Sequence, residues 1–507
     1  MGRHRDVAGR GVAARVRVGG TGRGCRAQRG CPAGAGSRAL APLGSSVEDG
    51  GMTRILIVGA GLAGLSAARE LTQAGVECVV LEARSRVGGR VMGGSVAGQA
   101  VEFGGTWIGE RHERMYALAA ELGLPTFRTY NDDGQLLVDL AGRQSRMKPT
   151  KGAVPKLSPF ALADLGQGLL RFARMAKGVD PERPWQHAHA ATLDGQTFET
   201  WIRRNLRTPS GRAYFRIATE AVFAADPSDL SLLHALFYTA SNADLETLLA
   251  VDHGAQQDRV VGGTIRIAES LAEGLDIRLD SPVRGIQQSP NGIRAVCRDG
   301  ATHDADRVIV AIPPTLAGRI DYDPILPSWR DQLTQKLPAG AVAKTFAAYP
   351  TPFWREAGLN GQAASDRGPV KVTFDVSPPN GEVGILLGFV EGGDARRWVR
   401  LTQAERRRTV LDCFVRYFGP EAANPIDYAE QDWSAEEFSR GCYGAHFAPG
   451  VWTAYGEALR PPIGRIHWAG AEYATRWNGY MEGAVRSGTD AAREVLASLS
   501  AGAPTGT

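Results

Sequence analysis

The pattern of apolar and polar positions near residue 54 predicts a strand, a tight turn, a helix and a second strand in close succession. Residues 54–58 read RILIV, and the glycine-rich run GAGLAG follows at 59–64. A stretch with helical spacing comes next, and VVLE at 79–82 ends the unit. This order of elements is typical of a βαβ unit whose first turn binds a dinucleotide.

The apolar pattern changes several times along the remaining chain. Apolar residues with helical spacing predict helices at 113–122, through most of 155–250, from 263 to 271, at 402–418 and from about 480 to 499. Alternation and β-rich composition predict strands at 277–279, 283–287, 293–297, 307–311, 370–374, 384–390 and 465–469.

The glycine-rich turn carries the first candidate chemistry. Gly59 allows the sharp turn, Gly61 lets the backbone approach a pyrophosphate, and Gly64 lets the helix pack closely on the strand. The helix N-terminus then offers free N–H groups to the phosphates. Glu82 follows Gly59 by 23 residues and ends the second strand, where a carboxylate can accept both ribose hydroxyls. The motif predicts a dinucleotide site, and a glycine-rich turn without a ligand is the alternative.

Length and charge exclude some classes of function. A chain of 507 residues is too long for one small core, so two domains are expected. Residues 1–51 hold nine arginines and three acids, whereas the other residues hold 49 basic and 51 acidic side chains. The body is therefore close to neutral, without the broad basic surface that nucleic-acid binding requires.

The N-terminal residues and the cysteines favour a location in the cytoplasm. Residues 1–51 are rich in Gly, Ala and Arg and lack an apolar signal region, so they read as a disordered basic tail or as sequence upstream of a start at Met52. Six cysteines show no metal-binding spacing, which favours reduced thiols in the cytoplasm. The sequence contains no run of about 18 apolar residues, so no membrane span is expected. The histidines form no triad or metal cluster in the sequence, and no metal site is expected.

Several longer stretches resemble the flavin-containing monoamine oxidase family over about residues 53–497. They read VGAGLAGLSAARELTQAG, VVLEARSRVGGRV, EFGGTWIG, VGGTIRIAESLAE, VIVAIPPTLAGRI, AVAKTFAAYPTPFWR, LLGFVEGG, SRGCYGAHFAPGVWTAYG and IHWAGAEYATRWNGYMEGAVRSG. The resemblance implies an α/β fold in which an FAD-binding Rossmann-like domain of the glutathione-reductase type is joined to an α+β substrate domain. It also implies FAD rather than NAD, which agrees with the two glycine pairs that follow the ribose acid.

The two-domain amine oxidase architecture implies that each domain is assembled from separate segments. The predicted segments are 1–51 (tail or upstream sequence), 52–130, 259–320 and 439–500 (FAD-binding domain), 131–258 (substrate domain, mostly helical), 321–438 (substrate domain, strands plus helices) and 501–507 (disordered).

The resemblance also assigns cofactor contacts to positions of this sequence. It places the pyrophosphate at the glycine-rich turn, the ribose at Glu82, the adenine at the backbone of Val283, and the flavin near the C-terminal glycine loop and helix. The residues implied to bind FAD are Gly59, Ala60, Gly61, Ala63, Gly64, Glu82, Ala83, Arg84, Gly89, Arg90, Gly105, Thr106, Trp107, Val283, Cys442, Gly470, Glu472, Tyr480 and Met481. In family members with covalent FAD, a cysteine at the position of Cys442 forms a thioether, and covalent and non-covalent binding both remain open here.

Three residues are implied to carry chemistry. Tyr443 and Tyr480 match the two rings that flank the substrate amine in front of the flavin. Lys344 matches a lysine that contacts a water next to the flavin; by pattern alone it reads as a strand lysine whose ammonium reaches solvent. The resemblance places Leu249, Gln256 and Phe389 with the two tyrosines in the substrate pocket.

The resulting hypothesis is an FAD-dependent oxidase that converts a primary aromatic or aliphatic amine into an imine by hydride transfer, giving an aldehyde, ammonia and H2O2, with O2 as acceptor. An L-amino-acid oxidase would need an Arg for the carboxylate, and a polyamine or putrescine oxidase would need an acid at the far end of the pocket. A non-catalytic flavoprotein is a more distant alternative. The expected partners are a small amine and O2, and a homodimer is left open.

Overall fold

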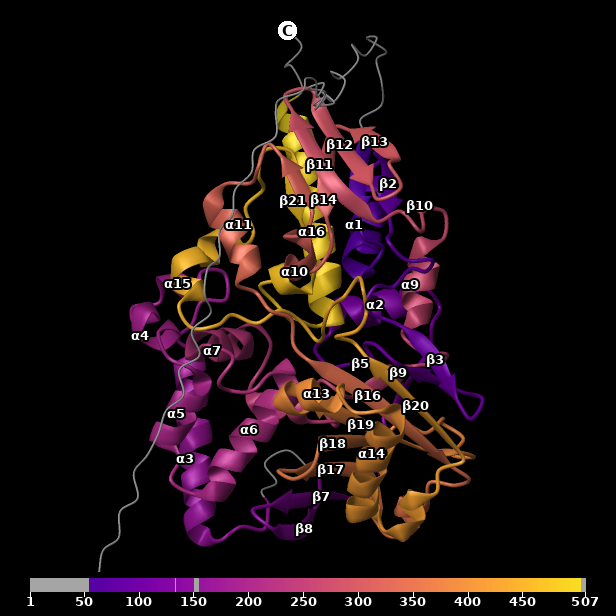
Figure 1. Ribbon diagram of the computed structural model, residues 1–507, viewed down its shortest axis with the longest axis vertical. Coiled ribbons are helices and arrows are strands. Elements are labelled where there is room, and N and C mark those ends of the chain that lie inside the picture. The colour runs from indigo at the N-terminus through magenta and orange to yellow at the C-terminus, as the bar shows by residue number, and fades with distance from the viewer. Residues whose placement is uncertain (1–53, 133, 150–154, 503–507) are drawn as a thin grey trace, which may run out of the picture. The chain divides into compact units, whose positions relative to one another are not determined.

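The predicted βαβ unit is present at the start of the described chain (Figure 1). The structure is a computed structural model that describes residues 54–132, 134–149 and 155–502. Strand β1 (Arg54–Val58) and strand β2 (Glu77–Leu81) run parallel on either side of the crossover made by helix α1 (Leu62–Gln73). Both strands are buried after their first residue, which explains their nearly continuous apolar sequence.

A five-stranded parallel sheet grows around this unit in the order β10-β2-β1-β14-β21. The added strands are β10 (Asp276–Arg278), β14 (Arg307–Val310) and β21 (Ile466–Trp468). Helix α16 (Met481–Gly502) packs against α1. At Gly488 a side chain would lie 2.1 Å from the backbone oxygen of Ala63, so the two helices touch through their backbones. These elements confirm the predicted Rossmann-like domain.

Smaller sheets and helices complete this part of the molecule. A four-stranded sheet has the order β13-β12-β11-β15, a hairpin joins β3 to β4, and a three-stranded sheet has the order β5-β9-β6. Their bounds are β3 (Gly93–Val96), β4 (Gln99–Glu102), β5 (Trp107–Ile108), β6 (Thr126–Arg128), β9 (Asp258–Val260), β11 (Val283–Ser289), β12 (Gly292–Cys297), β13 (Thr302–Ala305) and β15 (Asp321–Asp323), with helices α2 (Glu113–Glu121), α9 (Ile265–Ala272) and α10 (Pro314–Ala317).

A seven-stranded sheet with the order β20-β16-β19-β18-β17-β7-β8 forms the second large framework. Its strands are β7 (Gln135–Leu140), β8 (Arg143–Met147), β16 (Val342–Tyr349), β17 (Leu359–Ser365), β18 (Val370–Asp375), β19 (Gly384–Glu391) and β20 (Asp427–Asp432). Strands β16 and β19 are buried along their whole length. One face, which includes Ala343 and Leu386, packs on helices α13 (Gly392–Trp398) and α14 (Gln403–Phe418), and the opposite face carries Phe346 and Phe389.

Helices between residues 159 and 249 form the remaining layer. They are α3 (Pro159–Ala176), α4 (Ala190–Asp194), α5 (Phe198–Asn205), α6 (Pro209–Phe223), α7 (Leu232–Ser241) and α8 (Leu245–Leu249). All of these except α4 begin after a Ser, Thr or Asp whose side chain accepts a hydrogen bond from a backbone N–H of the first turn. Such caps satisfy the free donors of a helix N-terminus, which explains why the chain starts new helices at these points.

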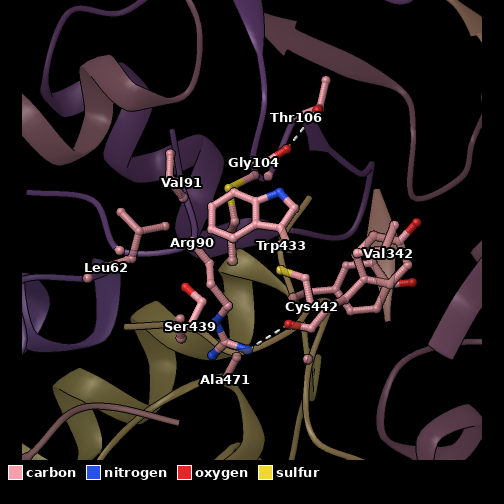
Figure 2. Close-up of a pocket in the computed structure, with 18 of the residues that line it drawn as sticks. Leu62, Arg90, Val91, Gly104, Thr106, Val342, Trp433, Ser439, Cys442 and Ala471 are labelled. Carbon is pink, nitrogen blue, oxygen red and sulfur yellow. Dashed lines mark hydrogen bonds between the residues drawn. The ribbon is translucent and has the colours of Figure 1, made fainter. Parts of the chain in front are cut away.

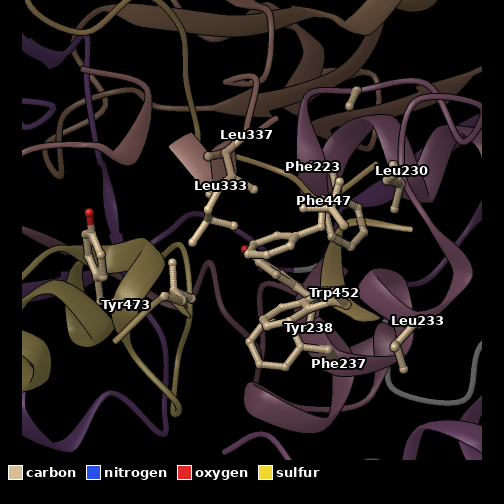
Figure 3. Packing of buried hydrophobic residues seen from close by; sticks show 14 of the residues in the cluster. Phe223, Leu230, Leu233, Phe237, Tyr238, Leu333, Leu337, Phe447, Trp452 and Tyr473 are labelled. Carbon is tan, nitrogen blue, oxygen red and sulfur yellow. The ribbon is translucent and has the colours of Figure 1, made fainter. Parts of the chain in front are cut away.

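An aromatic cluster joins these helices to segments from the C-terminal third (Figure 3). Phe447 and Trp452 stack with ring centroids 3.9 Å apart, and Phe237 of α7 contacts the Trp452 ring. The short elements around the cluster are α11 (Ser328–Gln335), α15 (Val451–Tyr455) and the 3-10 turns η1 (Pro184–Gln186), η3 (Gly456–Ala458) and η4 (Ala471–Tyr473). Helix α12 (Phe353–Glu356) and the turn η2 (Pro420–Ala423) pack instead with the seven-stranded sheet and α14.

Comparison with the predicted segments shows three differences. The segment 131–258 was expected to be mostly helical; it contains α3 to α8, but it begins with the strands β7 and β8, and β17, the partner of β7, lies more than 200 residues later. The boundary at 320/321 separates β15 from β11, its partner in the four-stranded sheet. Helix α16 extends to Gly502, so it includes the first two residues of the segment 501–507 that was expected to be disordered. The prediction for residues 1–51 lies outside the described residues.

Candidate functional site

An elongated cavity connects the glycine-rich turn after β1 to the face of the seven-stranded sheet. It leaves about 260 Å³ in which the centre of a water molecule can move. Arg90, Trp433 and Cys442 lie around this space in Figure 2, although they come from segments far apart in the sequence. The cavity lining includes most of the residues predicted for cofactor and substrate, namely Gly59, Gly61, Ala63, Glu82, Arg84, Gly89, Arg90, Gly105, Thr106, Trp107, Leu249, Gln256, Lys344, Phe389, Cys442, Tyr443, Gly470, Tyr480 and Met481.

The glycine-rich turn presents backbone to one end of the cavity. Gly59 has φ +103°, a conformation that favours glycine, and Gly61 immediately precedes the first residue of α1. Ala60 and Gly64 do not line the cavity: a side chain at Gly64 would lie 1.9 Å from the Gly59 oxygen, so this glycine serves the packing of α1 on the turn. The N-terminus of α1 therefore lies at the cavity, where its free N–H groups can meet a ligand.

Glu82 lies beside this turn and is 3% exposed. Its carboxylate accepts hydrogen bonds from the backbone N–H of Ala60 at 2.7 Å and of Arg84 at 2.9 Å. A carboxylate has about four acceptor positions, so two remain for a ligand in the cavity.

A second cavity continues the first beyond Glu82. The two share Gly59, Glu82 and Arg84 in their linings, so they adjoin at these residues. Ala83 and Val283, which the resemblance assigns to the cofactor, line only this second cavity.

Arg90 and Glu472 form an ion pair at the wall of the main cavity. The Arg90 guanidinium donates to both carboxylate oxygens of Glu472, at 2.6 and 2.8 Å, and to the backbone oxygen of Tyr443 at 2.6 Å. Glu472 is 2% exposed and lies outside the lining of both cavities. Glu472 orients the Arg90 guanidinium at the wall, and its own contact with a cofactor stays a prediction.

Lys344 points from the middle of β16 into the cavity and is 3% exposed. Its ammonium donates to the backbone oxygens of Glu102 at 2.5 Å and Gly104 at 2.9 Å and to Oγ1 of Thr106 at 2.7 Å. The interpretation of Lys344 as a strand lysine whose ammonium reaches solvent is therefore wrong. All three N–H groups are used in this structure, so a water at Lys344 has to replace one of these acceptors.

Burial also changes the acid–base behaviour of Lys344. It lowers the pKa of the ammonium to about 7, against the opposing effect of the Glu102 carboxylate. That carboxylate is held by the Arg259 guanidinium at 2.9 Å, and both side chains of this pair are buried. The site can therefore hold a cation or release a proton near neutral pH.

Tyr443 and Tyr480 contribute two aromatic rings to the same cavity. Tyr443 contacts the ring of Phe389, with centroids 6.2 Å apart, and its hydroxyl donates to Oε1 of Glu391 at 2.7 Å. Tyr480 directly precedes α16 and is supported by Trp477 and His112, with centroids 5.3 and 5.5 Å away. Fixed rings at the wall of a buried cavity provide π-faces for a cationic or neutral amine and exclude water.

Cys442 directly precedes Tyr443, and the peptide bond between them is cis. The thiol is buried, lines the cavity and forms no disulfide. Burial raises its pKa to about 11, although the Arg90 guanidinium acts in the opposite direction. The sulfur is therefore protonated at neutral pH in the absence of a ligand.

Sequence reasoning missed several residues of the cavity wall. Glu391, Tyr238 and Trp433 all line it. Glu391 ends an apolar strand and reads as its polar boundary, and Tyr238 lies inside an apolar helix, so residue type alone identified neither. For Glu391, a signal was available in the two-residue spacing from Phe389, which puts both side chains on one face of β19.

Other classes of site find no support in the described part of the chain. Its residues contain no group of His, Cys, Asp and Glu arranged to hold a metal ion. Within residues 54–132, 134–149 and 155–502, none of the helices combines the length and apolarity needed to cross a membrane.

Comparisons with known proteins agree with this site. Residues 62–496 match the family model described as flavin containing amine oxidoreductase. AofH of Mycobacterium tuberculosis, a protein assigned to the flavin-containing monoamine oxidases, is 45% identical over 447 residues, which cover 88% of this chain and 97% of that protein.

Two solved structures are similar over the same region. Cyclohexylamine oxidase from Brevibacterium oxydans has a TM-score of 0.84 at 31% identity, covering 89% of this chain and all of that chain. Putrescine oxidase in a complex with putrescine has a TM-score of 0.83 at 32% identity, covering 88% of this chain and 99% of that chain.

Proposed function

We propose that this chain, which belongs to the flavin-containing amine oxidoreductase family, oxidises a primary amine with FAD as cofactor and O2 as acceptor. The overall reaction consumes the amine, O2 and one water and yields an aldehyde, ammonia and H2O2. The observation that carries the proposal is the convergence of the glycine turn, Lys344, Tyr443 and Tyr480 on one cavity.

The residues present suit FAD. The two adjoining cavities provide an extended space, with the glycine turn and Glu82 near the middle and the residues implied to contact flavin toward one end. Gly61 and Gly89 face each other so closely that a side chain at Gly89 would lie 3.2 Å from the Gly61 Cα. We propose that the turn and α1 hold the pyrophosphate, Glu82 the ribose, Val283 the adenine, and Arg90, Cys442 and Met481 the flavin.

The protein then supplies binding, orientation and exclusion of water. When bound, FAD supplies the redox chemistry: it accepts a hydride equivalent from the substrate carbon and passes electrons to O2. Tyr443 and Tyr480 hold the amine by their ring faces, while Phe389, Leu249 and Gln256 line the approach to them. The ion pair with Glu472 fixes the Arg90 side chain beside this region.

Anaerobic addition of a primary amine is expected to bleach the flavin absorbance of the purified protein. A panel of tyramine, phenethylamine, putrescine and L-amino acids, read by flavin bleaching and by peroxide release, separates the amine oxidase from an amino-acid oxidase. Tyr480→Ala should keep its flavin but lose roughly 10-fold or more in the rate of bleaching, because one wall of the amine site is removed. Absence of bleaching by every amine would support a non-catalytic flavoprotein.

Cys442 provides a test of how the cofactor is held. We expect a thioether between its sulfur and the flavin methyl group. Formation of this bond is a two-electron oxidation: the thiol and the methyl group each lose one hydrogen, and O2 accepts both. After denaturation in acid, the yellow colour should sediment with the wild-type protein and remain in the supernatant for Cys442→Ala. Release of all colour from the wild type contradicts the covalent bond without affecting the proposed reaction. The cytoplasmic location and the homodimer stay predictions.

A further inference from the structure

Tyr480 packs against two aromatic side chains that do not line the cavity. Its ring meets those of Trp477 and His112 edge to face, with centroids 5.3 and 5.5 Å away, and these two rings meet each other in the same way at 4.3 Å. The three rings therefore form a closed triangle. Tyr480 is the member of the triangle that lines the cavity, so the other two support its ring from behind.

His112 makes a second contact, to the backbone of another part of the cavity wall. Its Nδ1 accepts a hydrogen bond from the backbone N–H of Gly109 at 2.9 Å. Gly109 directly follows β5, whose Trp107 lines the cavity. An imidazole whose Nδ1 is an acceptor carries its proton on Nε2. One side chain thus connects the end of β5 to the Tyr480 ring, although the two segments are far apart in the sequence.

Histidine provides two contacts here that other side chains provide only singly. His112 is 0% exposed, and its Nε2 has no hydrogen-bond partner among the described residues. A buried donor without a partner costs stability, and a phenyl ring would avoid that cost. A phenyl ring cannot accept the N–H of Gly109, however, and an amide side chain cannot complete the ring triangle. The imidazole satisfies both requirements.

The helices that carry these residues are also held together by contacts that do not involve the imidazole. His112 is the N-cap residue of α2, and Tyr480 directly precedes α16. Glu482, in the first turn of α16, accepts two backbone N–H groups at the start of α2, at 3.2 and 2.9 Å, and Nε of Arg486 at 2.6 Å. A change of the imidazole is therefore expected to leave the two helices in place.

The surroundings of His112 keep its ring uncharged. Burial lowers the pKa of the imidazole to about 3, and the Arg486 guanidinium of α16 acts in the same direction. The nearby Glu482 carboxylate is already paired with Arg486 and the α2 backbone. His112 therefore gains no proton near neutral pH, and its contribution to a reaction is geometric.

We propose that His112 is a positioning residue for amine oxidation: its imidazole ties the end of β5 to the back of the Tyr480 ring and sets the angle at which that ring meets the substrate. This rests on the proposed function, in which Tyr480 holds the reacting amine. A tilted ring presents a different part of its π-face, so the amine leaves the geometry that the reaction needs. His112 does not line the cavity and acts through Tyr480.

Two substitutions separate the two contacts of His112. His112→Asn keeps an acceptor near the place of Nδ1 and removes the ring, whereas His112→Phe keeps a ring and removes the acceptor. Each is expected to lower the limiting rate of anaerobic flavin bleaching by an amine about 5-fold, with unchanged flavin content. His189→Asn, which changes an exposed histidine, is the matched control and should behave as the wild type. Bleaching at the wild-type rate in both variants overturns the proposal.

A double-mutant cycle shows whether the loss is transmitted by Tyr480. In a Tyr480→Ala background, His112→Asn is expected to change the bleaching rate by less than about 2-fold, because the ring that it positions is absent. Equal losses in the two backgrounds would indicate a general disturbance and contradict the proposal.

The dependence on pH distinguishes positioning from proton transfer. The loss in His112→Asn should have the same size between about pH 6 and 9, because the wild-type imidazole stays uncharged over this range. A loss that varies with the titration of a histidine would show that His112 acts as an acid or base, which overturns the positioning role.

Crystal structures of the holoenzyme variants give a measurement that does not depend on amine oxidation. In His112→Asn the Tyr480 ring should leave its angle of 80° to Trp477. Thermal unfolding shows whether His112→Phe folds, and His112→Asn carries the test if it does not. A Tyr480 ring that stays in place in the folded variants overturns the proposal. If no amine bleaches the wild-type flavin, the proposed function fails, and the ring angle still decides whether His112 positions Tyr480.

Discussion

Replacing Lys344 by methionine is expected to slow the reaction of the reduced protein with O2 about 100-fold, while reduction by the amine changes by less than about 5-fold. Methionine preserves the length and the apolar part of the side chain and removes the charge. O2 acquires negative charge as it accepts electrons, and a fixed cation in a buried site stabilises that charge strongly. Tyr443 and Tyr480, which hold the amine, keep their places in the cavity wall.

The protonation of Lys344 gives this prediction a dependence on pH. Burial lowers the pKa of the ammonium to about 7, so the cation is present below that pH and is lost above it. The wild-type rate with O2 should therefore fall as pH rises. The fall should be centred at or above pH 7, because a reduced, negatively charged cofactor nearby raises the pKa of the lysine. The methionine variant should show the low rate at every pH.

Stopped-flow absorbance measures the two half-reactions separately, with anaerobic amine for reduction and O2 for oxidation. Lys336→Met, which removes an exposed lysine eight residues earlier, is the matched control and should behave as the wild type in both. Equal losses in the two half-reactions of Lys344→Met would contradict the assigned role and point to a general disturbance of β16 and its contacts with Glu102, Gly104 and Thr106.

Local patterns in the sequence predicted the parallel sheet because its elements are close in sequence. The apolar run at 54–58, the glycine turn and the strand that ends at 81 are all encoded within 30 residues, and the structure confirms each of them. The later strands at 307–310 and 466–468 were also apolar enough to be recognised. How these strands pair depends on contacts across hundreds of residues, and the family resemblance supplied that order.

The strands of the substrate region were harder to predict. Strand β7 reads QLLVDL, and its three buried apolar residues are also compatible with a short helix. Its neighbour β17 contains Asn360 and Gln362, which are buried because both donate amide hydrogen bonds to Oδ1 of Asn131. Polar residues of this kind resemble surface positions in a sequence, since their partners become neighbours only after folding.

The same limit applies to the site. Residue type and motif context identified Lys344, Tyr443 and Tyr480, but the local pattern around Lys344 favoured a solvent-exposed ammonium. Its three acceptors lie about 240 residues earlier, and the lysine is buried only because those acceptors are present. Glu391 was not identified from the sequence because its hydrogen-bond partner is 52 residues away and its burial arises only on folding.

Replacing Gly64 by alanine is expected to remove most of the bound flavin and to lower the free energy of unfolding by at least about 3 kcal/mol. The added Cβ would lie 1.9 Å from the carbonyl oxygen of Gly59, whereas ordinary contacts begin at 3.4 Å, so α1 would have to retreat by roughly 1.5 Å. Gly59 cannot easily yield, because its own N–H donates to Leu81 at 2.8 Å and Ala311 and Ile312 enclose it.

The displacement of α1 in Gly64→Ala is expected to affect both the stability of the protein and the binding of the cofactor, and the two effects can be measured separately. The N-terminus of α1 offers its N–H groups to the pyrophosphate, and these groups move with the helix. Gly166→Ala in the middle of α3 is the matched control: its Cβ meets no atom within 4 Å, and alanine favours a helix over glycine by about 0.5–1 kcal/mol. The ratio of flavin to protein after purification and thermal unfolding measure both effects. A Gly64→Ala protein with full flavin content would show that close packing of α1 on the turn does not position the cofactor site.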